Sequence, residues 1–355
     1  MKQVMITGGA GFIGANLAAH YLNKNYRVVI YDTLGRNGCI ENVKWLGGHK
    51  NSKNLCLQIG DIRLPTRAFQ QEIEASDALF HFAAQVAVTT SVTDPVYDFE
   101  VNALGTFKLL ELVRTSKGKK PAFFFASTNK VYGGMEDIRI IESDDKYSYG
   151  DLPGGITEGT NLDFHSPYGC SNGAADQYVR DYARIYGLDT VVFRQSCIYG
   201  YRQFGLEDQG WVAWFIIAAI LGRPITIYGD GKQVRDILFI DDLINAYDSA
   251  WTRIDSIKGQ IYNIGGGPHN TISLRNLISI LRSDVNQNLS IANAGWRPGD
   301  QPVYVSNIDK AYRDFGWKPV VDWKTGIERL MTWVRENKSM LERLFVGAIP
   351  ILFLV

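Results

Sequence analysis

The sequence predicts an α/β fold: a Rossmann-type, doubly wound parallel sheet with a smaller C-terminal lobe. Two observations support this fold class. In the first half of the chain, short β-rich runs alternate with helical stretches, which is the pattern of βαβ units. A glycine-rich turn also follows the first of these runs and opens the first helix. With 355 residues, the chain is long enough for about two domains.

The predicted elements of the first half follow one another in a regular order. Residues 3–7 form an apolar run typical of a buried strand, and residues 12–23 form the helix that the glycine turn opens. Further strands are predicted at 27–32, 55–60, 78–84 and 122–127. A long helical pattern covers 96–116. The second half is less regular, with helical patterns at 211–222, 240–252, 273–282 and 325–338 and short strands at 225–228 and 261–265.

These elements predict two lobes and a tail. We place the main lobe at 1–195 and the smaller lobe at 196–345, with the alternative that the chain crosses back between them. Residues 344–355 are almost wholly apolar, and 346–355 form a separate tail. Twelve residues are too few to span a bilayer, which needs about 20. We expect the tail to pack on the core or on a partner subunit, with peripheral membrane contact as the alternative.

Composition excludes several classes of function. Lys and Arg total 37 and Asp and Glu also total 37, so there is no basic excess of the kind that nucleic-acid binding uses. The four cysteines form no CxxC pair, which argues against a zinc site and a disulfide framework and favours a reducing compartment, the cytoplasm. The first residues are typical of a strand and turn and lack the pattern of a signal peptide.

The glycine-rich turn predicts a dinucleotide site. Gly8, Gly11 and Gly14 follow a GxxGxxG spacing, with Phe12 and Ile13 opening the helix. Glycine permits a tight turn and a close approach of the backbone to a pyrophosphate, whose charge the helix N-terminus favours. The strand–turn–helix context makes this motif more specific than a glycine run alone.

Asp32 ends the second predicted strand and predicts NAD as the cofactor, not NADP. A carboxylate there can accept both hydrogen bonds of the adenosine ribose diol and would repel a 2′-phosphate. The alternative is a turn or cap residue. Asp61 and Ile62 follow the third strand and would border the adenine, with a simple turn as the alternative.

A second group of polar residues, Ser127, Thr128 and Asn129, follows the fifth strand. Residues at the carboxyl ends of parallel strands face the same crevice, so these side chains should lie near the glycine turn. The Thr128 hydroxyl and the Tyr168 phenol could meet there on a substrate alcohol. A tyrosinate can act as the base for that alcohol if its pKa is lowered. The alternative for Tyr168 is a packing role, as for most of the 18 tyrosines.

Several longer blocks carry a specific resemblance: TGGAGFIG, GDIR, HFAAQ, VNALGT, STNKVYG, SPYG, GDGKQVRD and RPGDQ. With these motifs the chain resembles the extended short-chain dehydrogenases/reductases, in the group of NAD-dependent nucleotide-sugar epimerases and dehydratases. Within that group it is most similar to the CDP-tyvelose 2-epimerases, also called CDP-paratose 2-epimerases. The subgroup resemblance rests on VAVTTSV, STNKVYG, LDFHSPYGCSNGAADQY and YRQFGLEDQGW, and it covers about residues 1–338.

The resemblance implies a mechanism and a set of site residues. Tightly held NAD+ takes a hydride from C2 of a CDP-linked deoxyhexose, a tyrosine takes the hydroxyl proton, and the hydride returns to the other face of the 2-keto sugar. It implies that 1–195 binds NAD and 196–345 binds the nucleotide sugar. The implied catalytic residues are Thr128, Tyr168 and Asn172. The implied cofactor-binding residues are Gly8, Gly11, Phe12, Ile13, Gly14, Asp32, Asp61, Ile62, Ala83, Ala84, Asn102, Ser127, Tyr168 and Asn172. The implied substrate-binding residues are Gln85, Thr128, Asn129, Gln209, Arg235 and Arg297, and no metal is expected.

Asn172 is the one serious departure from the family pattern. The family motif is Tyr-x-x-x-Lys, whereas the chain carries Asn172 four residues after Tyr168. The family lysine lowers the pKa of the tyrosine and bonds the nicotinamide ribose; asparagine can donate a hydrogen bond but carries no charge. A weakened variant, an enzyme with altered chemistry and a non-catalytic NAD or nucleotide-sugar binder all remain open, as does 4-epimerisation. Dehydration is disfavoured because no Asp-Glu pair follows Thr128.

A homo-oligomer, a dimer or a dimer of dimers, is also expected. Related family members pair two helices across a two-fold axis, and most closed oligomers contain such dimers. The corresponding helical stretches here are 96–116 and 168–186. Apolar residues expected beyond their core faces are Phe107, Leu110, Val113, Tyr178, Tyr182 and Ile185. The alternative is that these residues only pack on the sheet.

Overall fold

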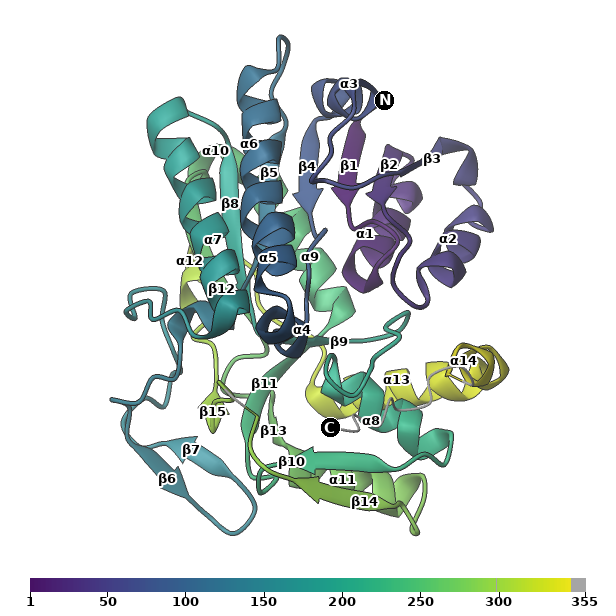
Figure 1. Cartoon of the computed structure of the whole chain (residues 1–355), viewed down its shortest axis with the longest axis vertical. Helices are drawn as coiled ribbons and strands as arrows, with labels where there is room; N and C mark the ends of the chain where they lie inside the picture. The colour runs from purple at the N-terminus through teal and green to yellow at the C-terminus, as the bar shows by residue number, and fades with distance from the viewer. Residues whose placement is uncertain (298, 346–355) are drawn as a thin grey trace.

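The computed structural model describes residues 1–297 and 299–345, and it is built on a seven-stranded sheet in the order β12-β8-β5-β4-β1-β2-β3 (Figure 1). Every pairing in this sheet is parallel. Its strands are β1 Gln3–Thr7, β2 Arg27–Asp32, β3 Leu55–Ile59, β4 Ala78–His81, β5 Ala122–Thr128, β8 Thr190–Gln195 and β12 Gln260–Ile264. The strand order reverses between β1 and β4. A doubly wound sheet opens its ligand crevice at such a point, beyond the carboxyl ends of the strands.

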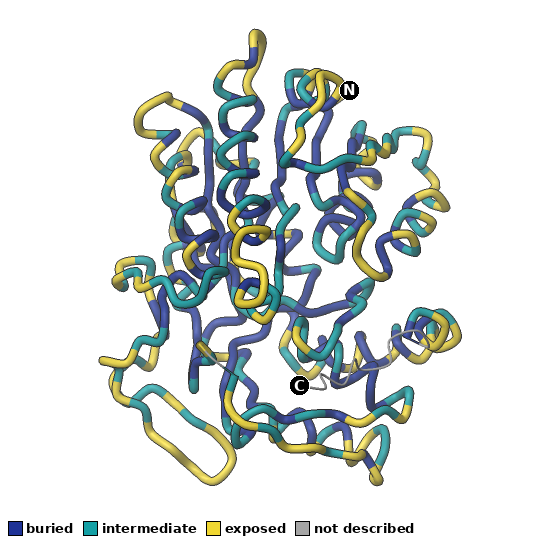
Figure 2. Tube along the Cα trace, viewed as in Figure 1, coloured by how far each residue is buried: buried dark blue, intermediate teal, exposed yellow. Residues whose placement is uncertain are grey.

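Two separate cores cover the two faces of this sheet. Alternate residues of one strand enter different cores, so Val4 and Ile6 pack on one face while Met5 packs on the other. This double burial explains why the predicted strands are continuous apolar runs. The first face packs against α1 Phe12–Asn23, α2 Cys39–Gly47 and α9 Ile240–Thr252, and the second against α3 Arg67–Ala75, α6 Gly105–Thr115 and α7 Ser166–Tyr186. Figure 2 shows the inner strands of the sheet as a buried centre, whereas the edge strand β3 is only half-buried.

The smaller lobe lies beyond the carboxyl end of the large sheet (Figure 1). Its strands are β9 Cys197–Tyr199, β10 Ile225–Tyr228, β11 Val234–Phe239, β13 Thr271–Ser273, β14 Ile291–Ala294 and β15 Val303–Tyr304. Its helices are α8 Trp211–Ile220, α11 Leu274–Asp284, α13 Trp323–Glu336 and α14 Lys338–Phe345. The other elements are α4 Val88–Thr93, α5 Pro95–Phe99, η1 Ser52–Asn54, η2 Glu100–Leu104, η3 Asn129–Tyr132, β6 Ile140–Glu142, β7 Tyr147–Tyr149, α10 Ile254–Ile257 and α12 Asp309–Phe315.

The chain crosses between the lobes more than once. β8 ends at the predicted boundary, but β12 returns to become an edge strand of the large sheet. In the other direction, the β6–β7 hairpin reaches the smaller lobe, where the Tyr147 amide bonds the Lys232 carbonyl at 3.0 Å. Each lobe therefore uses segments from both sides of residue 195. The predicted tail, 346–355, lies outside the described residues, and within them no helix is long and apolar enough to cross a membrane.

The predicted helix at 96–116 is three consecutive elements. α5 begins at Pro95, where Asp94 caps it by accepting from the Tyr97 amide. The π-helical turn η2 follows and leads into α6. A π-turn adds one residue to the helical repeat, which rotates the residues that follow it relative to a continuous α-helix. Asn102, at the centre of η2, is buried.

Candidate active site

Two adjoining cavities form a cleft where the order of the large sheet reverses. One, of about 310 Å³, extends over the ends of β1 and β2, and the other, of about 250 Å³, over the ends of β5 and β8. Phe12, Ile13, Phe82, Ala84, Val86 and Gln209 line both cavities. Because these residues line both, the two cavities adjoin, and one elongated ligand can occupy both. Ten of the predicted cofactor residues line the first cavity: Gly8, Gly11, Phe12, Ile13, Gly14, Asp32, Asp61, Ile62, Ala83 and Ala84. Three more, Ser127, Tyr168 and Asn172, line the second.

The glycine turn leaves no room for side chains. Gly8 has φ +68°, and a Cβ there would lie 2.7 Å from the Ala83 nitrogen. A Cβ on Gly14 would lie 2.3 Å from the Gly8 carbonyl oxygen, so this glycine is needed for the turn to contact the helix. No side chain caps the start of α1, which leaves its first amides free to donate to a ligand. This cradle fits the diphosphate of a dinucleotide.

The Asp32 carboxylate is fixed at the end of β2. Its Oδ2 accepts from the Ala10 amide at 3.0 Å, and its Oδ1 accepts from the Leu34 amide at 2.8 Å. Each carboxylate oxygen can accept a further bond, so the pair remains available for a ribose diol. Asp61 instead holds Arg63, whose guanidinium bonds it at 2.7 Å and keeps the pKa of the carboxyl below its ordinary value.

The second cavity brings together the residues predicted for catalysis. Ser127, Thr128, Tyr168 and Asn172 all line it. β5 ends at Thr128, and α7 begins two residues before Tyr168, so the end of a strand and the first turn of a helix face one another. Ser127 donates to Asp176 at 2.8 Å, which ties β5 to α7. Asn172 is 3 % exposed, and its amide donates to the Tyr168 carbonyl at 2.9 Å.

The surroundings of Tyr168 keep its phenol protonated. Burial raises the pKa of Tyr168, and the nearby Asp98 carboxylate raises it further. A hydrogen bond with Thr128 and the Arg36 guanidinium act in the opposite direction, but the pKa stays above its ordinary value. Asn172 contributes no charge. The predicted base therefore starts from a less favourable pKa than a free phenol.

Asn102 and Gln85 support the wall of the cleft from behind. Asn102 accepts from the Gln85 amide at 2.8 Å and donates to the Gln85 carbonyl at 3.0 Å. The Gln85 side chain donates to the Ala87 carbonyl at 2.8 Å and to Asp98 at 2.7 Å. Both side chains are buried among protein partners. Asn102 and Gln85 were predicted to contact ligands, but in the structure they hold the segment that lines the cleft in place.

Three other predicted substrate residues make their contacts within the protein. Arg235 donates to Asp300 at 2.6 Å, and Arg297 donates to the Glu207 carbonyl at 3.0 Å while covering the Tyr228 ring. Asn129 is buried and accepts from the Thr128 hydroxyl at 3.5 Å. Their predicted contacts with a nucleotide sugar stay predictions.

Several lining residues were not predicted. Gln195, Ser196, Cys197 and Trp211 complete the second cavity on the side of the smaller lobe. Residues 190–195 form a further mostly apolar run, which becomes β8. Gln195 ends this strand, so the expectation that residues at the carboxyl ends of parallel strands face the cleft applies to it as it does to Thr128. Arg36 lines the first cavity and donates to Gln209, a contact between the two lobes that no local motif indicates.

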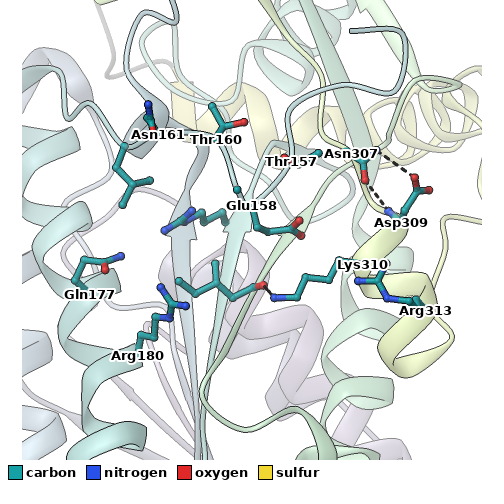
Figure 3. A pocket seen from close by; sticks show the side chains of 14 residues that line it. Thr157, Glu158, Thr160, Asn161, Gln177, Arg180, Asn307, Asp309, Lys310 and Arg313 are labelled. Atoms are coloured by element: carbon teal, nitrogen blue, oxygen red, sulfur yellow. Dashed lines mark hydrogen bonds between the residues drawn. The ribbon is translucent and has the colours of Figure 1, made fainter.

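A separate cavity of about 680 Å³ lies beside β12 and shares no lining residue with the cleft. Figure 3 shows Arg180 from α7 and Lys310 and Arg313 from α12 on its wall, with Glu158 among them. Protein carboxylates pair with its cations: Asp176 with Arg194 at 2.9 Å and Asp314 with Arg313 at 3.2 Å. None of the predicted site residues lines it. Over the described residues, no cluster of ligands fit for a metal ion is present.

Comparison with known proteins agrees with the dinucleotide site that the geometry of the cleft indicates. The pattern of the NAD dependent epimerase/dehydratase family matches residues 4–265. CDP-paratose 2-epimerase from Salmonella typhi is 42 % identical over 336 residues, covering 93 % of this chain and 98 % of that protein. DesIV, a dTDP-glucose 4,6-dehydratase from Streptomyces venezuelae solved with NAD and TYD bound, aligns with a TM-score of 0.80 at 28 % identity, over 96 % of this chain and 99 % of that one. UDP-glucuronic acid 4-epimerase from Bacillus cereus, solved with UDP-glucuronic acid and NAD, gives 0.79 at 26 %, over 94 % and 99 %.

Proposed function

The chain belongs to the NAD dependent epimerase/dehydratase family, and from this premise we propose that it inverts C2 of a CDP-linked deoxyhexose through a 2-keto intermediate. This is the type of reaction that relates CDP-paratose to CDP-tyvelose. Family membership and the similarity to an epimerase over 93 % of the chain make the protein an NAD-dependent nucleotide-sugar epimerase. That the nucleotide base is cytosine and that the inverted carbon is C2 is our proposal.

The observation that carries the proposal is the shared cleft. The glycine cradle and Asp32 line one end of it, and Thr128 and Tyr168 line the other. A dinucleotide held by its diphosphate in the cradle and by its ribose on Asp32 would place its far end beside Tyr168. Similarity to CDP-paratose 2-epimerase over 93 % of the chain supports the CDP-sugar as the second ligand.

The residues of the cleft divide the chemistry between them. Bound NAD supplies the acceptor and donor of a hydride at the sugar carbon. Tyr168 takes the proton of the sugar hydroxyl and returns it, while Thr128 holds the same hydroxyl by a hydrogen bond. Asn172 offers its remaining amide hydrogen and its oxygen to the nicotinamide ribose, because only one amide hydrogen is used on the Tyr168 carbonyl.

Two other functions have observations in their favour. Similar proteins include a UDP-glucose 4-epimerase from Thermotoga maritima and several dTDP-glucose 4,6-dehydratases, so 4-epimerisation is the main alternative within the family. Dehydration is disfavoured because Asn129 and Lys130, which are not acids, follow Thr128. A non-catalytic binder of NAD and nucleotide sugar is favoured by the raised pKa of Tyr168 together with the uncharged Asn172.

The test combines mass spectrometry with a substrate panel. We expect the denatured protein to release NAD and no NADP, because Asp32 holds the ribose diol. Incubation with CDP-paratose should yield a C2 epimer by NMR, whereas UDP-glucose and dTDP-glucose should remain unchanged. Conversion at C4 of UDP-glucose would replace the proposal with 4-epimerisation. Retained NAD without turnover of any CDP-, UDP-, dTDP- or GDP-sugar would support the non-catalytic binder.

We also propose that the protein forms a homodimer through α6 and α7. The predicted interface needs correction at Leu110 and Val113, which are fully buried against the sheet because α6 turns these positions inward. Tyr182 is 5 % exposed as well. The apolar residues that α7 leaves outside are Tyr178, Ile185 and Tyr186, at 49 %, 65 % and 47 % exposed. Phe107 of α6 contacts Tyr178 edge to face.

Light scattering at micromolar concentration should give twice the chain mass. Ile185→Glu should produce the monomer, because a charge would be buried in an apolar interface. Val320→Glu is the matched control: Val320 is 75 % exposed, and its amide bonds Asp242 of α9, which packs on the other face of the sheet from α6 and α7, so the dimer should persist. A monomer in the unmodified protein would refute the interface.

A further inference from the structure

Asp98 is a buried carboxylate on α5 that neither the predicted site nor the proposed chemistry uses. Its side chain is fully buried. Its Oδ1 accepts from the Gln85 amide at 2.7 Å and from the Asn102 amide at 3.1 Å, and its Oδ2 accepts from the Ser171 hydroxyl at 2.5 Å. All three donors are uncharged. A buried carboxylate is costly, so its retention with neutral partners calls for a role.

The three donors belong to the walls of the cleft. Gln85 lies between Ala84 and Val86, which line both cavities. Ser171 lies on α7 between Tyr168 and Asn172, and both of these line the catalytic cavity. Asp98 therefore joins the segment after β4 to the first turns of α7. Its charge lies directly behind the surface on which the nicotinamide end of the cofactor would rest.

The charges that act on Tyr168 are few. They are the Asp98 carboxylate and the Arg36 guanidinium, with Thr128 as a neutral hydrogen-bond partner. Arg36 is solvent-exposed and already donates to Gln209, so water screens its charge more than that of Asp98. Asn172 adds no cation. Of the two charges that act on Tyr168, the buried one is therefore negative.

We propose that Asp98 is a positioning residue that holds both walls together and makes the cleft prefer the oxidised cofactor over the reduced one. The inference rests on the proposed function for the location of the nicotinamide ring beside Tyr168 and Asn172. NAD+ and NADH differ by one positive charge on that ring. A buried anion behind the wall stabilises the cationic form, and here no lysine ammonium offsets it.

Asp98→Asn removes the negative charge and keeps the size and shape of the side chain. The asparagine oxygen can still accept from Gln85 and Asn102, and its amide can donate to the Ser171 oxygen, so the network stays satisfied. The dissociation constants of NAD+ and NADH are measured by calorimetry on protein freed of cofactor. We expect their ratio, NAD+ over NADH, to rise by about 3- to 10-fold. Asp94→Asn is the matched control: it removes one charge from an exposed position of the same segment and keeps a helix cap, so the ratio should not change.

The outcomes separate a field effect from a structural one. An unchanged ratio with a lowered melting temperature in Asp98→Asn would overturn the proposal and leave Asp98 as a packing residue. If that variant does not fold, Asp98→Ser provides the second reading: it also removes the charge and keeps a hydroxyl that can accept from Gln85 or Asn102, so the ratio should rise in the same way. A flat ratio there would also overturn it. If the wild-type protein bound both dinucleotides but turned over no sugar, the proposed function would be refuted. The proposal for Asp98 would still be tested, because the ratio is obtained from dissociation constants and not from turnover.

Discussion

Replacing Tyr168 with phenylalanine is expected to lower turnover of the CDP-hexose by about 10²- to 10⁴-fold, the contribution of a positioned acid–base group. Phenylalanine keeps the ring that lines the catalytic cavity and removes only the hydroxyl. Thr128 cannot replace it, because an aliphatic hydroxyl is a far weaker acid than a phenol. The measurement is kcat at saturating nucleotide sugar, with the NAD content of each preparation determined by mass spectrometry.

Tyr178→Phe is the matched control for this change. Tyr178 lies on the same helix, but it is 49 % exposed on the outer face and lines neither cavity of the cleft. Loss of its hydroxyl should leave kcat within about twofold of the wild type. If Tyr168→Phe retained full activity with full NAD content, another group would be the base, and the assignment of Tyr168 would be wrong.

Asn172→Lys should have the second-largest effect, and in the opposite direction. An ammonium four residues after Tyr168 lies on the same helix face and favours the phenolate. A downward pKa shift of two to three would raise the tyrosinate fraction by about 10²- to 10³-fold at neutral pH. Turnover should rise by less, about 10- to 10²-fold, because a less basic phenolate is a weaker base. Side-by-side kcat values for the two proteins on the same CDP-hexose test this.

The pH profile gives an independent check on the same change. Tyr168 must lose its proton to act as the base, so activity rises with pH through its pKa. Burial and Asp98 raise this pKa, so the rise should lie at high pH in the Asn172 protein and move to lower pH in Asn172→Lys. Lys130 does not supply the missing charge, since its ammonium donates to the Gly299 carbonyl at 3.1 Å and lies beside Asp300. Identical profiles in the two proteins would contradict our account of position 172.

Most of the strand pattern and much of the cleft could be predicted from the sequence. The predicted strand at 27–32 and helix at 12–23 match β2 and α1 residue for residue, because a strand buried on both faces and a helix opened by glycines have strong local patterns. Thr128 and Tyr168 line one cavity, as predicted from strand ends that meet at one edge of a parallel sheet. Leu110 and Val113 were misplaced because an apolar helical residue can face either the sheet or a partner subunit, and only the packing of α6 on the sheet shows which.

The sequence by itself determined the sheet class, the glycine cradle, the aspartate that ends β2 and the asparagine four residues after Tyr168, since each depends on residues close together in the chain or on one rule about strand ends. Only the tertiary structure decided which distant residues line or support the same cleft. β12 returns from the second half to the edge of the large sheet, Gln195 and Cys197 close the catalytic cavity, and Asp98 lies buried behind Gln85 and Ser171. These contacts join residues separated by up to 73 positions in the Asp98 network. Packing of whole elements against one another sets such contacts, and no local spacing encodes them.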